Sequence, residues 1–184
     1  MQRRFWEENM RASLALLFLM STVLLALSVP TSNAQPAPEV KFSLTYLASS
    51  SALIKPIPIG PGRELTVSSA RVLTANDAGT GLFHHLIGRC LMSAIVDKEA
   101  ATLEQHGFCA YADADGDRVW ETVDTDKQPF GPVFTGNGEL IWGTGKYAGI
   151  EGSFEIHHSP KSAIEGVMHG FGKVTGSYRL RSKR

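Results

Sequence analysis

The sequence predicts an all-β protein, a single antiparallel β-barrel of about eight strands that is closed or nearly closed and carries one hairpin disulfide. Short runs of alternating apolar and polar residues recur along the chain, separated by turn-forming residues. The two cysteines lie in two such neighbouring runs. Glycines inside the later runs indicate bends that let a sheet curl shut, and closure removes exposed sheet edges.

The N-terminal segment has the pattern of a secretory signal. Arg3, Arg4 and Arg11 precede an apolar run over residues 13–29, which is followed by small residues ending at Ala34. We expect cleavage after Ala34, so that residues 1–34 are a signal peptide, and an uncleaved membrane anchor is the alternative. The mature protein is then exported to a periplasmic or extracellular location, with no stable membrane insertion.

Charge and length favour one globular domain after residue 34. Of the 18 basic and 18 acidic residues, three basic and two acidic ones lie in residues 1–34, so the mature chain is close to neutral. A nucleic-acid partner is not expected, because such proteins carry a basic surplus. Residues 35–62 are predicted to form a Pro-rich leader, the first strand and a loop. Residues 63–184 complete the same barrel domain, which spans 39–181 overall.

The first part of the barrel alternates strands with turn-rich segments. The alternation of Val40, Phe42, Leu44 and Tyr46 predicts a strand with one buried face. Residues 54–62 contain three prolines, which remove ladder hydrogen bonds, so an extended surface loop or edge crossing is expected. Residues 64–74 are predicted to be the next strand and residues 76–81 a loop.

The disulfide follows from the next two strands, residues 86–96 and 102–112. Folding one onto the other about Glu99 and Ala100 places Cys90 directly opposite Cys109. Directly opposed residues of antiparallel strands are close enough for a disulfide, and cysteines in an exported chain normally pair. The alternative is two reduced, buried cysteines.

The candidate ligand-binding residues come from the face that carries Cys90, which is predicted to point inward. This face includes Leu86, Met92 and Tyr111. A second turn centred on Asp115 and Gly116 places Tyr111 opposite Trp120, so both rings are expected in the lumen. Alternation then sends Glu121 to the outer face. A barrel of this size can enclose a cavity or be filled by its own side chains, and both remain open.

Beyond Val123 the composition changes, and eleven of the 18 glycines lie between Gly131 and Gly176. Pro129 and Pro132 mark a long connection. Four further strands are predicted over residues 140–142, 152–158, 163–170 and 173–180.

The stretch WGTGKYAGIEGSF, residues 142–154, resembles the G-x-G-x-[FY]-x-G-x-x-G segment of the allene oxide cyclase and dirigent-type β-barrels. The residues that match this segment are Gly143, Gly145, Tyr147, Gly149 and Gly152. Overall the chain is most similar in character to small exported bacterial proteins of unknown function that carry this barrel. The resemblance implies a calycin-like eight-stranded barrel with an apolar cavity. It implies no catalytic residue, because the shared motif is one of backbone geometry.

A metal site is considered at the acidic turn. Asp113, Asp115, Asp117 and Asp124 have the spacing of calcium ligands in an EF-hand loop. Arg118, however, stands where that loop needs glycine, so a polar hairpin turn is the preferred interpretation. Adjacent histidines of a strand point to opposite faces, which weakens a zinc site. No metal and no cofactor are expected.

Two classes of function remain. The favoured one is an exported barrel that binds a small apolar or aromatic molecule, or serves a structural role in the cell envelope. The alternative is a cofactor-free isomerase or cyclase of the allene oxide cyclase type. No Ser/His/Asp or cysteine nucleophile pattern is present, so an enzyme is the less favoured class. A desolvated ionisable side chain inside the cavity would favour the enzyme.

Overall fold

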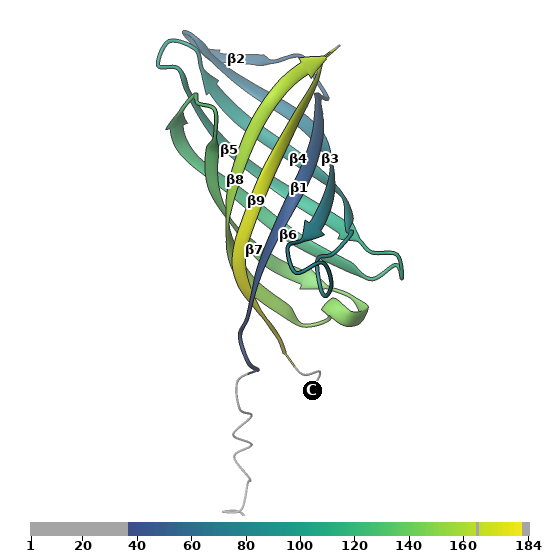
Figure 1. Ribbon diagram of the computed structural model, residues 1–184. Coiled ribbons are helices and arrows are strands. Elements are labelled where there is room, and N and C mark those ends of the chain that lie inside the picture. The colour runs from purple at the N-terminus through teal and green to yellow at the C-terminus, as the bar shows by residue number, and fades with distance from the viewer. Residues whose placement is uncertain (1–36, 165, 182–184) are drawn as a thin grey trace, which may run out of the picture. The chain divides into compact units, whose positions relative to one another are not determined.

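The computed structural model describes residues 37–164 and 166–181, which form an antiparallel β-barrel (Figure 1). The predicted signal peptide lies outside the described residues. Strand bounds are β1 Val40–Ala52, β2 Ile57–Gly60, β3 Arg63–Asn76, β4 Ile87–Asp97, β5 Thr102–Ala112, β6 Arg118–Pro129, β7 Phe134–Gly143, β8 Ile150–Ile164 and β9 Val167–Leu180, with a short 3-10 helix, η1, at Gly145–Tyr147. No helix in the described ranges has the length and apolar character needed to cross a membrane.

Barrel closure depends on β1. Strands β3 to β9 pair in chain order, and β1 pairs with β9 on one side and with β3 on the other. Eight antiparallel strands therefore close on themselves, and β2 is an additional strand on the edge of β3. The predicted fold class is confirmed.

The proline-rich segment forms the additional edge strand. β2 pairs with the first residues of β3, with Ile57 opposite Leu65. From Ser68 onward the same edge of β3 pairs with β1. Proline is tolerated here because, among the described strands, one edge of β2 forms no backbone hydrogen bonds with a neighbour. The predicted edge crossing over residues 54–62 is confirmed.

The disulfide hairpin has the predicted register. Cys90 lies opposite Cys109 on β4 and β5, with their Cα atoms 4.0 Å apart, and the two sulfurs are bonded. The face that carries Cys90 points into the barrel, where Leu86, Met92 and Tyr111 line the interior. On the opposite face, Ile87 is 70% exposed.

The register of the next hairpin differs from the prediction. The Asp113 N–H donates to the carbonyl of Asp117, and Gly116 has a φ of 85°, so the loop holds three residues rather than two. Tyr111 consequently pairs with Val119, and Trp120 faces outward. There its ring packs against that of Trp142, which is 59% exposed, with 4.5 Å between centroids. The predicted lumenal position of Trp120 is wrong.

Strands β8 and β9 form one long hairpin where three short strands were predicted. Its tight turn, with Gly166 at a φ of 80°, lies inside the predicted strand 163–170. Pro160 stays within β8 at a bulge, and Gly170 and Gly172 stay within β9. These residues indicate turns in the sequence but here lie within paired strands.

One end of the barrel is closed by the loop between β3 and β4. The ring of Phe83 packs against those of Phe42 and Tyr178, at centroid distances of 4.6 and 5.5 Å. The Thr74 hydroxyl holds the loop by donating to the Phe83 carbonyl and accepting from the Leu86 amide. The loop was predicted over residues 76–81, but it extends to Leu86 because these two apolar side chains turn inward.

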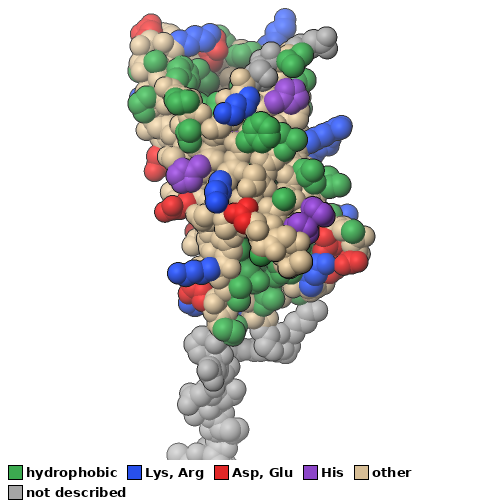
Figure 2. Space-filling view, in the orientation of Figure 1, with side chains coloured by type: hydrophobic (Ala, Val, Ile, Leu, Met, Phe, Trp, Pro, Cys, Tyr) green, Lys and Arg blue, Asp and Glu red, His purple; other side chains and the backbone are tan. Residues whose placement is uncertain are grey.

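The outer face is more apolar than that of a simple half-solvated sheet. Phe171, Leu47, Leu73 and Ile87 are exposed and pair successively across β9, β1, β3 and β4. Figure 2 shows apolar side chains interspersed with charged ones on the face that it views. Because both faces of the strands carry apolar residues, the alternation of apolar and polar residues alone assigns the inward and outward faces only weakly.

Candidate functional site

The barrel encloses a cavity of about 700 Å³. Its wall is mainly apolar, with Leu44, Ala70, Val72, Leu140 and Val174 among the lining residues. The lining continues to Ser51, Phe130 and Met168, which are exposed near the hairpins at the end that carries β2. The cavity therefore opens at this end and is closed at the other by Phe83 and Leu86. A packed barrel interior, the other outcome left open by the sequence, is not what the structure shows.

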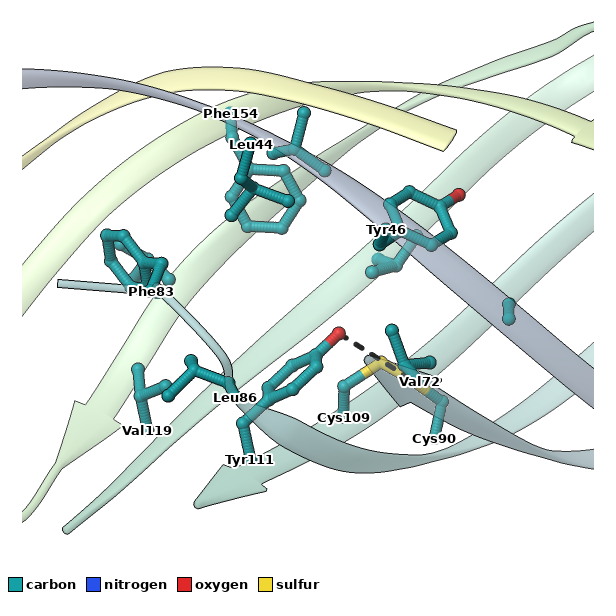
Figure 3. Close-up of a cluster of buried hydrophobic side chains, with 14 of the residues drawn as sticks. Leu44, Tyr46, Val72, Phe83, Leu86, Cys90, Cys109, Tyr111, Val119 and Phe154 are labelled. Carbon is teal, nitrogen blue, oxygen red and sulfur yellow. Dashed lines mark hydrogen bonds between the residues drawn. A yellow bond between two sulfur atoms is a disulfide. The ribbon is translucent and has the colours of Figure 1, made fainter. Parts of the chain in front are cut away.

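A carboxylic acid lies in the wall of this cavity. Glu121 on β6 faces inward, and the Tyr111 hydroxyl of β5 donates to its Oε1 at 2.8 Å. The same hydroxyl lies 3.8 Å from Cys90 Sγ, so the disulfide, the phenol and the carboxyl group form one continuous cluster. Figure 3 shows Tyr111 directed at the disulfide within the apolar cluster. Among the described residues, Tyr111 is the one side-chain hydrogen-bond partner of the Glu121 carboxyl group.

A second polar pair lines the lumen. The Tyr46 hydroxyl of β1 and Nδ1 of His158 on β8 lie 2.8 Å apart, and the two rings stack with an interplanar angle of 9°. Both residues line the cavity. The lumen thus holds two phenols, one carboxyl group and one imidazole within an otherwise largely apolar wall.

Glycines on neighbouring strands make room for both tyrosines. A Cβ at Gly88 would lie 2.2 Å from the Tyr111 ring, and one at Gly172 would lie 2.0 Å from the Tyr46 ring. Each ring therefore lies flat across a glycine of the adjacent strand. The glycines set the positions of the polar groups in the lumen.

Burial shifts the acidity of all four groups. Enclosure by the barrel raises the pKa of Glu121 from its ordinary 4.5 to about 7, although the Tyr111 hydrogen bond acts in the opposite direction. Burial also raises the pKa of Tyr46 and of Tyr111, and the nearby Glu121 charge adds to both shifts. Burial lowers the pKa of His158, which keeps its imidazole neutral near pH 7.

Three of the four predicted ligand-binding residues, Leu86, Met92 and Tyr111, line the cavity, and Trp120 does not. The predicted outward position of Glu121 is wrong, because the observed loop is one residue longer than predicted and Glu121 takes the inward position expected for Trp120. Gly116 could have indicated the longer loop. A three-residue hairpin loop is commonly a type I turn followed by a left-handed residue, and glycine suits that third position.

The four aspartates of the candidate metal site do not converge. Asp113 and Asp115 both contact Lys146 Nζ, at 2.7 and 2.8 Å, and Asp117 accepts from the Lys146 amide. Asp124 lies further along β6 and pairs with His106. No cluster of three or more His, Cys, Asp or Glu side chains suited to a metal occurs in the described part of the chain.

The glycine motif forms the connection between β7 and β8. Gly143 ends β7, Gly145 begins η1, and the ring of Tyr147 is buried in the core at 1% exposure. Gly149 has a φ of 76°, and a Cβ there would lie 2.6 Å from the Arg181 carbonyl oxygen. Gly152 is the first residue of β8 that pairs with β7, and a Cβ there would lie 2.2 Å from the Ser177 carbonyl oxygen.

The sequence matches no protein-family model, and no curated protein matches it. Among solved structures, the chain is similar to the pterocarpan synthase dirigent protein GePTS1, with 14% identity and a TM-score of 0.47 over 78% of this chain and 93% of that chain. It is also similar to the pterocarpan synthase dirigent protein PsPTS1, with 11% identity and a TM-score of 0.46 over 81% and 99%. These matches are to dirigent proteins, the barrels that the glycine motif resembles. The likeness is one of fold, and no residue role is transferred from it.

Proposed function

We propose that this protein is an exported barrel that binds a small, largely apolar molecule in its lumen. The observation that carries the proposal is the cavity of about 700 Å³, apolar over most of its wall and open at one end. Ligand sites typically have volumes of about 300–1,000 Å³ and place a few polar groups in an apolar lining. The disulfide and the signal-like N-terminal pattern support export.

The test is to fill the lumen with a side chain and measure ligand binding. N-phenyl-1-naphthylamine, a neutral apolar dye that fluoresces on leaving water, serves as the reporter. Ala48→Trp places an indole in the cavity, whereas Leu47→Trp places the same group on the outer face of the same strand. We expect Ala48→Trp to raise the dissociation constant at least roughly tenfold and Leu47→Trp to change it less than about twofold.

Ala70→Phe is a second inward variant that repeats the test with a different strand, β3. Both inward variants must retain the far-UV spectrum of the barrel. Equal dye binding by the wild type and the folded inward variants would show that the dye does not enter the lumen and would contradict the proposal.

A second candidate function is that of a cofactor-free isomerase or cyclase. The observation that favours it is Glu121, a carboxyl group inside an apolar lumen with a pKa of about 7 and a phenol in hydrogen-bond contact. Such a group accepts and returns a proton near neutral pH, which is what general acid–base catalysis of a rearrangement requires. Its test is whether Glu121 itself abstracts a proton from a probe substrate.

A further inference from the structure

The charge inside the lumen is of one sign. Glu121 is the one acidic side chain among the described residues that line the cavity, and none of those residues is a lysine or arginine. The other titratable groups that face the lumen are Tyr46 from β1, Tyr111 from β5 and His158 from β8. The residues of β7 that line it, Phe134 and Leu140, are apolar.

The Glu121 carboxylate has only neutral partners. Tyr111 donates one hydrogen bond to it, and no cation lies in the described wall to balance its charge. His158 is occupied by Tyr46 and is kept neutral by burial. An ionised carboxylate in such surroundings is costly unless a countercharge reaches it. The lumen therefore disfavours a second anion and offers one place where a cation is stabilised.

The tyrosine hydroxyls near Glu121 add to this preference. Tyr111 lies against the carboxylate and Tyr46 is close enough to be affected by its charge. A phenol oxygen can accept a hydrogen bond from an ammonium group, and aliphatic wall residues such as Val72 and Val123 suit a hydrocarbon body. A molecule with an apolar body and one ammonium group matches both features.

We propose that the lumen selects apolar molecules that carry a protonated amine, with the ammonium group bound to the Glu121 carboxylate. This inference rests on the proposed binding function and specifies its ligand class. Apolar carboxylic acids, such as fatty acids, bind more weakly because of repulsion by the same carboxylate. Neutral alcohols of the same size bind with intermediate affinity.

The test uses three probes with the same ten-carbon tail: decylamine, decanol and decanoate. Each displaces N-phenyl-1-naphthylamine from the wild-type protein at about pH 8, where the carboxyl group is largely ionised and the amine is charged. We expect the dissociation constant of decylamine to be at least roughly tenfold lower than that of decanol, and that of decanoate roughly tenfold higher. Lowering the pH to about 5.5 protonates Glu121 and should bring decylamine and decanol within about threefold of each other.

Glu121→Gln should likewise reduce the difference between decylamine and decanol to about threefold, because the amide keeps the shape and loses the charge. Glu139→Gln, a matched change at an exposed position on β7, should leave the order of the probes as in the wild type. The pH comparison needs no variant, so the proposal is tested even if Glu121→Gln does not fold.

Decanoate binding as tightly as decylamine would overturn the selection proposed here while leaving the lumen as a binding site. An amine preference that survives either low pH or the Glu121→Gln change would do the same. Failure of the neutral dye itself to bind would overturn the binding function and this inference together.

Discussion

Glu121 is the side chain on which acid–base chemistry in the lumen depends, and its basicity can be measured without knowing a natural substrate. The probe is 5-nitrobenzisoxazole, whose ring opens when a base removes the proton of the carbon next to nitrogen. The nitrogen–oxygen bond breaks as the nitrile forms, and a coloured nitrophenolate is released. We expect catalysis that rises with pH toward the Glu121 pKa of about 7 and then levels off, because the ionised carboxylate is the base.

In that assay Glu121→Gln should lower the rate roughly 100-fold, the size expected for loss of a positioned base. The exposed Glu139→Gln should leave the rate within about twofold of the wild type. A rate that keeps rising past pH 8, or equal rates for both variants, would contradict the assignment of Glu121 as a base and with it the isomerase alternative.

At the scale of single residues, the alternation of side chains along the strands correctly placed Leu86, Met92 and Tyr111 in the lumen. It misplaced Trp120 and Glu121. The pairing of Cys90 with Cys109 carried the inward assignment correctly to Tyr111, because both cysteines lie on uninterrupted strands. Beyond Tyr111 the assignment depended on the length of one loop. A single residue more in that loop moves Trp120 outside and Glu121 inside.

At the scale of elements, glycine was the source of both the correct and the incorrect predictions. In the β7–β8 connection the glycines form a tight turn, as the resemblance to the dirigent-type barrels implies. In β9 the same residue type lies inside a strand, since Gly172 makes room for the ring of Tyr46 on β1. Composition alone does not distinguish these uses, because the ring that needs the space belongs to a strand more than a hundred residues away.

The β7–β8 connection gives a direct prediction about stability. Gly149→Val should lower the free energy of unfolding by at least about 2 kcal/mol, because valine is strained at positive φ and its Cβ would meet the Arg181 backbone. Gly60→Val is the matched control, since β2 leaves open space at that position, and it should change stability by less than about 0.5 kcal/mol. Urea denaturation measures both. Equal stability of the two variants would contradict the turn geometry.

For the whole barrel, the number of strands was predictable and the content of the lumen was not. Alternation and turn spacing indicate about eight strands, and closure follows because an open sheet of this size leaves two edges. Whether the interior is packed or hollow depends on how residues from all eight strands fill one space. Here Ala48, Ala70 and Ala94 occupy inward positions where larger side chains would fill the space, and the cavity results.

The contribution of Glu121 to the stability of the barrel should fall as pH rises from about 4.5 to about 7. Below this window the carboxyl group is protonated in both states. Within it the unfolded chain releases the proton while the folded barrel retains it, so rising pH favours unfolding, by about 3 kcal/mol once pH exceeds 7. Glu121→Gln removes this loss, so urea denaturation should show the variant gaining about 3 kcal/mol relative to wild type between pH 4.5 and 8. The exposed Glu139→Gln should follow the wild-type curve. Parallel curves for the wild type and Glu121→Gln would mean that the carboxyl group is solvated in the folded barrel.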